Sequence, residues 1–294
     1  MIPFLHIGWL TIPTYGLMVA LAMLVSFYVL RADLRRRGIT TDAELFIAIP
    51  CISGIIGAKL YHVLESPADF LAHPWSELFS QFGFAWFGGL LAGFGAFVWL
   101  ARREGIPLLT MMDAGSPAAA LGYGIGRIGC FLSGDGDYGV PTSLPWGMSF
   151  PNGLVPTTER VHPTPIYELI VACLIAWVLW RIGARQISGA VKTSSSEKSK
   201  VGVPSGQELR RTKETGKGRG SASQVPSGGV FAAYLVLTGI ARFLVEFIRI
   251  KPRSFFGMTN AQTASLASIA SGIAIWWWLR AKSGRSPLDR GKSK

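Results

Sequence analysis

Seven segments of the chain are dominated by apolar residues, and each is about long enough to cross the ~30 Å hydrocarbon core of a bilayer as a helix. They cover residues 12–30, 43–64, 84–100, 112–132, 165–182, 229–247 and 263–280. Gly115, Pro117 and later glycines interrupt the fourth segment, and membrane helices tolerate such breaks where neighbouring helices or a cavity satisfy the backbone. The pattern predicts an all-α, polytopic membrane protein with about seven transmembrane helices.

The composition agrees with this fold class and shows where the charge lies. The chain is 49% hydrophobic and 16% charged, and its net charge is +12. Residues 181–228 and 280–294 together account for that whole excess. Clustering of Lys and Arg in cytoplasmic loops explains such a distribution. Nucleic-acid binding is the alternative, but the sequence has no groove-reading motif to support it, so we expect no nucleic-acid partner.

The basic residues alternate from loop to loop, which predicts the orientation of the chain. The first loop is rich in arginine, the third carries Arg102 and Arg103, and the N-terminal stretch and residues 65–83 have neither Lys nor Arg. We therefore expect the N-terminus outside and the C-terminus in the cytoplasm. Residues 248–262 break the pattern with Arg249, Lys251 and Arg253 on the predicted outer side, so those charges are expected to serve another purpose.

Four regions follow from these patterns. Residues 1–185 are predicted to hold the first five helices with their outer loops, and 229–282 the last two. Residues 186–228 are Ser-, Gly- and Lys-rich and should form a disordered basic cytoplasmic linker, because they lack the apolar side chains of a core. Residues 283–294 are predicted to be a basic cytoplasmic tail.

The three cysteines predict neither a disulfide framework nor a metal site. Cys51 and Cys173 lie in apolar runs, Cys130 follows a glycine, and no CxxC pair occurs. No cofactor motif is evident, so we expect neither a metal nor a cofactor.

Charged residues in or beside the apolar segments are the candidates for chemistry, because charge is costly in a bilayer. Asp113 and Glu168 fall near predicted helix ends, where extension towards the interface explains them. Arg127 lies among glycines, where a guanidinium is suited to bind a phosphate. Arg242, Glu246 and Arg249 have i, i+4, i+7 spacing, so we expect one helix face, either as a simple ion pair or as part of a polar cavity. Further polar groups gather towards the predicted outer face: Tyr15, Asp135, Asp137, Tyr138, His162, Tyr167 and Glu168. Anchoring at the interface is the alternative for His162 and Tyr167.

Five stretches, in order, resemble those of the bacterial prolipoprotein diacylglyceryl transferase family. Gly126-Arg-Ile-Gly129 with Gly134 resembles its signature segment, and Tyr15-Gly-Leu-Met18 its first-helix motif. Gly57-Ala-Lys-Leu-Tyr61 resembles a Gly-x-Arg-x-x-Tyr stretch, with Lys59 in place of arginine. The remaining two are 162–168, His-Pro-Thr-Pro-Ile-Tyr-Glu, and 242–249, Arg-Phe-Leu-Val-Glu-Phe-Ile-Arg.

The resemblance implies a multi-pass enzyme of the bacterial inner membrane. Its substrates are phosphatidylglycerol, which donates a diacylglyceryl group, and the lipobox cysteine of a preprolipoprotein signal peptide, with glycerol phosphate released and membrane lipids as surroundings. It implies that Arg127 and Arg242 bind the head group and stabilise the leaving phosphate, and we add Asp135 and Asp137 as catalytic candidates. The implied substrate-binding residues are Tyr15, Lys59, Gly88, Gly89, Gly134, Gly139, His162, Tyr167, Glu168, Glu246 and Arg249.

Three departures from the family pattern fall on the expected site. Phe87 stands before Gly88 and Gly89 where the family usually has the histidine often proposed as the base, Cys130 replaces the usual asparagine, and residues 135–138 are one residue longer than usual. His62, Asp135 or Asp137 could replace the histidine, or the substrate thiol could ionise without a dedicated base. The alternative is a lipid-binding or transporter-like paralogue that has lost the transfer reaction.

Overall fold

The computed structural model describes residues 1–79, 85–201, 225–250 and 257–284. Each of the seven apolar segments coincides with a helix: α1 Thr14–Arg36, α2 Leu45–Glu65, α5 Trp86–Arg103, α6 Leu108–Ser133, α7 Thr164–Val201, α8 Gly229–Val245 and α9 Asn260–Gly284. Within the described ranges, three segments are long and apolar enough to cross a membrane, Thr14–Arg36, Leu45–Glu65 and Thr164–Gly189, and Gly229–Val245 is a shorter apolar helix. The all-α membrane fold class is therefore confirmed.

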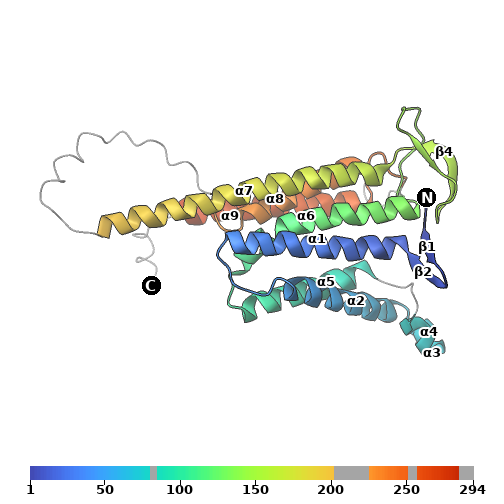
Figure 1. The fold of residues 1–294 in the computed structure, drawn as a ribbon, viewed down its shortest axis with the longest axis horizontal. Helices are drawn as coiled ribbons and strands as arrows, with labels where there is room; N and C mark the ends of the chain where they lie inside the picture. Colours follow the sequence, from blue (N-terminus) through green and yellow to red (C-terminus); the bar gives the residue numbers. More distant parts are fainter. Residues whose placement is uncertain (80–84, 202–224, 251–256, 285–294) are drawn as a thin grey trace, which may run out of the picture.

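Short elements gather at one end of the bundle, which we call the hairpin end (Figure 1). Strands β1 Phe4–Ile7 and β2 Leu10–Pro13 pair antiparallel, as do β3 Met148–Phe150 and β4 Thr157–Val161. Two short helices, α3 Pro67–Ala72 and α4 Pro74–Phe79, follow α2 at the same end. These additions lie outside the long helices and leave the helical architecture unchanged.

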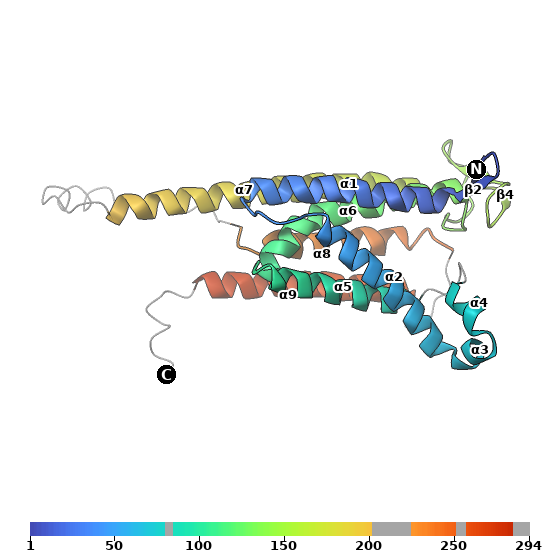
Figure 2. The same ribbon diagram turned by 60° about the horizontal axis from the view of Figure 1, so that its bottom comes forward.

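The long helices form two groups. Helix α6 packs against α1, α7 and α8, and α9 packs against α8, while α2 and α5 form a separate pair (Figure 2). An apolar cluster that includes Leu34, Phe46, Leu100 and Met111 joins the pair to the larger group at the end opposite the hairpins. The α2–α5 pair is therefore attached mainly through that opposite end.

Gly88 and Gly89, expected to bind substrate, lie in the contact between α5 and α2. A Cβ on Gly88 would lie 2.3 Å from the carbonyl oxygen of Gly57, and one on Gly89 would lie 3.2 Å from that of Gly54. Real Cβ atoms do not approach backbone oxygens at 2.3 Å, so Gly88 allows the two helices to meet. Close helix packing through small residues is a usual device in membrane proteins.

Asp113 does not reach towards the interface as its position near a predicted helix end suggested. Its side chain is fully buried and accepts hydrogen bonds from the backbone N–H of Gly228 at 2.7 Å and of Phe231 at 2.8 Å. The first N–H groups of a helix have no partner within the helix, and Asp113 supplies one for these two. A carboxylate at the start of a helix also interacts favourably with the helix dipole. Asp113 thus fixes the start of α8 from α6.

Gln186 joins this buried contact from α7. Its Nε2 donates to Asp113 Oδ2 at 2.7 Å and to the carbonyl of Pro226 at 2.6 Å, and its Oε1 accepts from Arg37 Nη1 at 2.8 Å. The predicted linker 186–228 therefore begins and ends beside one buried carboxylate. Helix α7 continues through Val201, and residues 202–224 lie outside the described part of the chain, so the linker and the predicted tail 283–294 stay predictions.

Candidate active site

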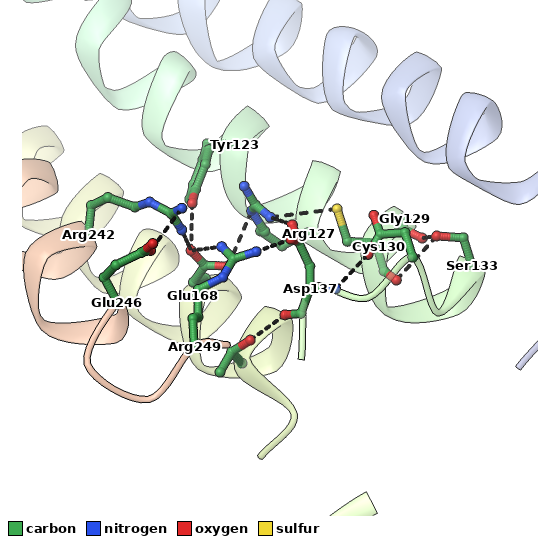
Figure 3. Close-up of polar contacts among 12 residues, drawn as sticks. Tyr123, Arg127, Gly129, Cys130, Ser133, Asp137, Glu168, Arg242, Glu246 and Arg249 are labelled. Atoms are coloured by element: carbon green, nitrogen blue, oxygen red, sulfur yellow. Dashed lines mark hydrogen bonds and ion pairs between the residues drawn. The ribbon is translucent and has the colours of Figure 1, made fainter. Parts of the chain in front are cut away.

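Three arginines and three carboxylates form an ion-pair network at the hairpin end (Figure 3). The arginines are Arg127 on α6, Arg242 on α8 and Arg249 beyond it, and the carboxylates are Asp137 after α6, Glu168 on α7 and Glu246 at the end of α8. We call these six residues the arginine network. The formal charges cancel, which lowers the cost of placing them between membrane helices.

Arg127 contacts two of the carboxylates. Its Nη1 donates to Asp137 Oδ2 at 2.6 Å, and its Nε lies 3.3 Å from Glu168 Oε2. These contacts use Nε and Nη1, so Nη2 is the guanidinium nitrogen left over from them. An arginine held on two edges presents its remaining donors in a fixed direction, as recognition of a phosphate requires.

Arg242 is held in the same way from α8. Its Nη1 donates to Glu168 Oε1 at 2.7 Å, and its Nη2 lies 3.1 Å from Glu246 Oε2, one helical turn away. The i, i+4 pairing expected of Arg242 and Glu246 is confirmed. Because Glu168 is also paired with Arg127, the two arginines are fixed relative to each other through one buried carboxylate. Extension towards the interface, suggested for Glu168, is therefore wrong.

Arg249 differs from the expectation that it shares a helix face with Arg242. Helix α8 ends at Val245, and Arg249 forms an isolated β-bridge with Gly139. Its side chain is 2% exposed and pairs through Nη2 with Asp137, with Nη1 3.7 Å from Glu168. Arg249 thus binds the segment after α6 to the end of α8, and this is the purpose of a charge that the loop pattern left unexplained.

Backbone hydrogen bonds keep the segment after α6 in place. Gly139 N–H donates to the His162 carbonyl at 2.8 Å, and Val140 N–H donates to that of Ile248 at 2.8 Å. The Thr164 hydroxyl donates to the Asp137 carbonyl. Gly139 is required here because a Cβ would lie 2.5 Å from the Ile248 carbonyl oxygen.

Gly134 ends α6 in the left-handed conformation, at φ 59°, and a Cβ there would lie 2.7 Å from Gly153 Cα. Both the backbone angle and the close approach favour glycine. Gly134 and Gly139 therefore shape the segment that carries Asp135 and Asp137.

The charges around Asp137 set its protonation state. Burial works against its ionisation, but Arg249 and Arg127 outweigh it and hold the pKa of Asp137 at about 2. Asp137 is therefore a fixed anion that accepts hydrogen bonds, and it is poorly suited to take a proton near neutral pH.

Asp135 is placed differently from Asp137. Its Oδ1 accepts a hydrogen bond from the Asp137 N–H at 3.1 Å, and neither Arg127 nor Arg249 is among its ion-pair partners. The Cys130 Sγ lies 3.6 Å from Arg127 Nη1, and one ligand atom each from Cys130, Asp135 and Asp137 fall within 4.8 Å of one another. Two arginines on Asp137 make this cluster unsuited to a metal cation.

The remaining predicted residues lie either on helices that pack with the arginine network's own helices or on the separate α2–α5 pair. Tyr167 lies at the start of α7, where its hydroxyl accepts from Trp146 Nε1 at 2.8 Å and lies 3.2 Å from His162 Nδ1. Tyr15 packs from α1 against Gly129 of the network's own helix, 3.1 Å from where a Cβ would be. Lys59, His62 and Phe87 instead belong to α2 and α5, which contribute no member of the arginine network. His62 lies 3.7 Å from Glu77 of α4.

Tyr123 is a member of the site that the sequence did not single out. Its hydroxyl donates to Glu168 Oε1 at 2.8 Å, and the Arg127 Cζ lies 4.9 Å from its ring centroid. The signal was its position four residues before Arg127, which places both side chains on one face of α6.

Comparison with known proteins gives a consistent match along the chain. A family model described as prolipoprotein diacylglyceryl transferase matches residues 3–196 and 217–278. A Synechococcus elongatus protein named phosphatidylglycerol–prolipoprotein diacylglyceryl transferase is 35% identical over 285 residues, covering 93% of this chain and 86% of its own. Proteins of the same name from Clostridium tetani and Bordetella avium are 30% and 29% identical, covering 89% and 96% of this chain and 91% and 96% of their own.

Proposed function

The chain belongs to the prolipoprotein diacylglyceryl transferase family, and from this premise we propose that it moves a diacylglyceryl group from phosphatidylglycerol to a cysteine thiol. The acceptor is the lipobox cysteine of a preprolipoprotein signal peptide, and glycerol phosphate is the second product. The enzyme acts as a multi-pass protein of the bacterial inner membrane, among the lipids that supply its donor.

The observation that carries this proposal is the pairing of Arg127 and Arg242 through Glu168. Each arginine keeps a nitrogen that these contacts do not use, Nη2 on Arg127 and Nε on Arg242. The two can donate to the phosphate of one lipid head group. Donors fixed in advance around developing charge are a main source of catalysis in such a low-dielectric site.

In the reaction the thiolate sulfur attacks the glyceryl carbon that bears the phosphate. The new S–C bond forms as the C–O bond to phosphate breaks, and the electron pair leaves with glycerol phosphate. The leaving group becomes more negative than the phosphodiester it came from, so the arginines bind it more tightly in the transition state. This difference between ground state and transition state is what accelerates the reaction.

The thiol of the lipobox cysteine must lose its proton to attack. Phe87 stands where the family usually has a histidine and cannot accept that proton, so another acceptor is needed. Nearby arginines favour the thiolate by lowering the pKa of a thiol from its usual ~8.5. Asp135 is our candidate acceptor, since it lies at the site and is not held by the arginines that bind Asp137. Asp137 acts by holding Arg127 and Arg249 in place.

We also propose seven membrane spans with the N-terminus outside and the C-terminus in the cytoplasm, which places the hairpin end outside. The alternation of basic loops supports this orientation. Reporters fused after Trp75 and after Ser205 should report the outside and the cytoplasm, respectively. Both reporters on one side of the membrane would show the topology to be wrong.

The function is tested by whether the chain restores lipoprotein modification in a bacterium depleted of its own transferase. We expect growth, and a lipoprotein whose mass increases by one diacylglyceryl group. A lipid-binding or transporter-like protein would give no mass increase although it reaches the membrane. That result, with expression verified, would reject the transferase assignment.

A further inference from the structure

Tyr123 touches two members of the arginine network that come from different helices. It lies on α6 one turn before Arg127, and its hydroxyl reaches across to Glu168 on α7. The residue is 42% exposed, whereas Glu168 is 6% exposed. Tyr123 therefore lies at the boundary between the buried network and the space around the helices.

The Tyr123 hydroxyl helps to determine which oxygen of Glu168 faces each arginine. Glu168 Oε1 accepts from Tyr123 at 2.8 Å and from Arg242 Nη1 at 2.7 Å, while Oε2 faces Arg127 Nε at 3.3 Å. Oε2 is buried and makes no hydrogen bond within the described residues. Two donors on Oε1 fix the orientation of the Glu168 carboxylate. Arg127 therefore faces Oε2, the oxygen that makes no hydrogen bond within the described residues.

The ring of Tyr123 restrains Arg127 from a second direction. The guanidinium lies over it, with Cζ 4.9 Å from the ring centroid, within the range of a cation–π contact. Arg127 is thus bounded by the ring, by Glu168 at Nε and by Asp137 at Nη1. The Arg127 side chain therefore has little room to move, and its Nη2 points in a fixed direction.

We infer that Tyr123 is a positioning residue for diacylglyceryl transfer, which holds the Arg127 guanidinium in the orientation that binds the leaving phosphate. This inference rests on the proposed function. Tyr123 acts through Arg127 and Glu168 and makes no bond to the reacting atoms. Its effect should therefore appear in the chemical step, because misplacing a preorganised donor weakens transition-state binding most.

Two substitutions separate the roles of ring and hydroxyl. Tyr123→Phe keeps the surface under Arg127 but removes the donor to Glu168, and we expect kcat to fall a few-fold. Tyr123→Leu removes both, and we expect kcat to fall by about tenfold or more, with KM for phosphatidylglycerol changed by less than about threefold. Tyr234→Phe is the matched control, because it removes a tyrosine hydroxyl from α8 outside the network, and its kcat should equal that of the wild type.

A double-mutant cycle tests whether Tyr123 acts through Arg127. In the Arg127→Lys background, Tyr123→Leu should cause little further loss, since the guanidinium that it positions is gone. The measurement is single-turnover transfer to a lipobox peptide in vesicles that contain phosphatidylglycerol. If Tyr123→Leu matches the wild type, or costs the same factor in both backgrounds, the inference is wrong. A wild-type protein that transfers nothing would instead reject the proposed function itself.

Discussion

We expect Arg127→Lys to reduce transfer by at least about a hundredfold, the typical loss when one preorganised donor is removed from a site of developing charge. Lysine keeps the charge but has no planar fork, so it cannot face Glu168 and Asp137 and still present a further donor to phosphate. Arg127→Ala and Arg242→Ala should lose at least as much. The measurement is the mass of a lipobox peptide incubated with membranes that contain phosphatidylglycerol.

Arg103→Lys is the control for this series. Arg103 is exposed at the opposite end of the bundle, and its guanidinium lies over the Trp99 ring at 5.4 Å. Arg103→Lys replaces a guanidinium with an ammonium group at a site that has no contact with the arginine network, so activity should not change. Wild-type turnover in both Arg127 variants would remove the head-group role from this residue.

Asp137→Asn is expected to damage both stability and activity. The Arg249 side chain, only 2% exposed, would lose the charge that faces Nη2 and keep Glu168 at 3.7 Å. Removing one partner of a buried ion pair commonly costs about 3–5 kcal/mol, because a buried charge is left uncompensated. We therefore expect a lower midpoint of thermal unfolding in detergent, together with a large loss of transfer.

Asp135→Asn should separate chemistry from stability. Asparagine can still accept the hydrogen bond from the Asp137 N–H but cannot take a proton as a carboxylate does. We expect an unchanged unfolding midpoint and at least about a tenfold lower kcat, a lower bound on the roughly hundredfold or more that a general base contributes. Full activity in this variant would show that the thiol proton leaves by another route.

The pKa of Asp137 also predicts how acid affects the protein. A carboxyl held at a pKa of about 2 stabilises the folded state fully above the ordinary aspartate value of about 4, and this contribution is lost as the pH falls towards 2. The difference in unfolding midpoint between the wild type and Asp137→Asn should therefore shrink across that interval.

The sequence was sufficient for the helices because long apolar helices are determined locally. Each of the seven segments rich in apolar residues coincides with one helix: α1, α2, α5, α6, α7, α8 and α9. The i, i+4 spacing also predicted the contact between Arg242 and Glu246. The family resemblance brought in Arg127, Glu168 and Arg249 as members of one site, and the structure places all three in the network.

What the sequence did not predict depends on contacts between distant segments. Spacing alone placed Arg249 on the helix of Arg242, but α8 ends at Val245 and Arg249 turns towards Asp137. The position of Asp113 near a predicted helix end suggested the interface, yet its partners lie 73 to 118 residues further along the chain. The positions of both side chains depend on partners in distant segments, and the periodicity of a single segment does not predict those partners.

The hydrogen bond from Gln186 to the Pro226 carbonyl has a consequence for how this protein can change over time. Gln186 Nε2 and the Pro226 carbonyl oxygen are 2.6 Å apart, so the length of chain between the two residues need not alter how α7 and α8 pack. Closing a longer loop costs little extra free energy, about 0.6 kcal/mol for each doubling of length. We therefore expect that changes in the length of the chain between α7 and α8 leave the register of the two helices beside Arg127 unchanged.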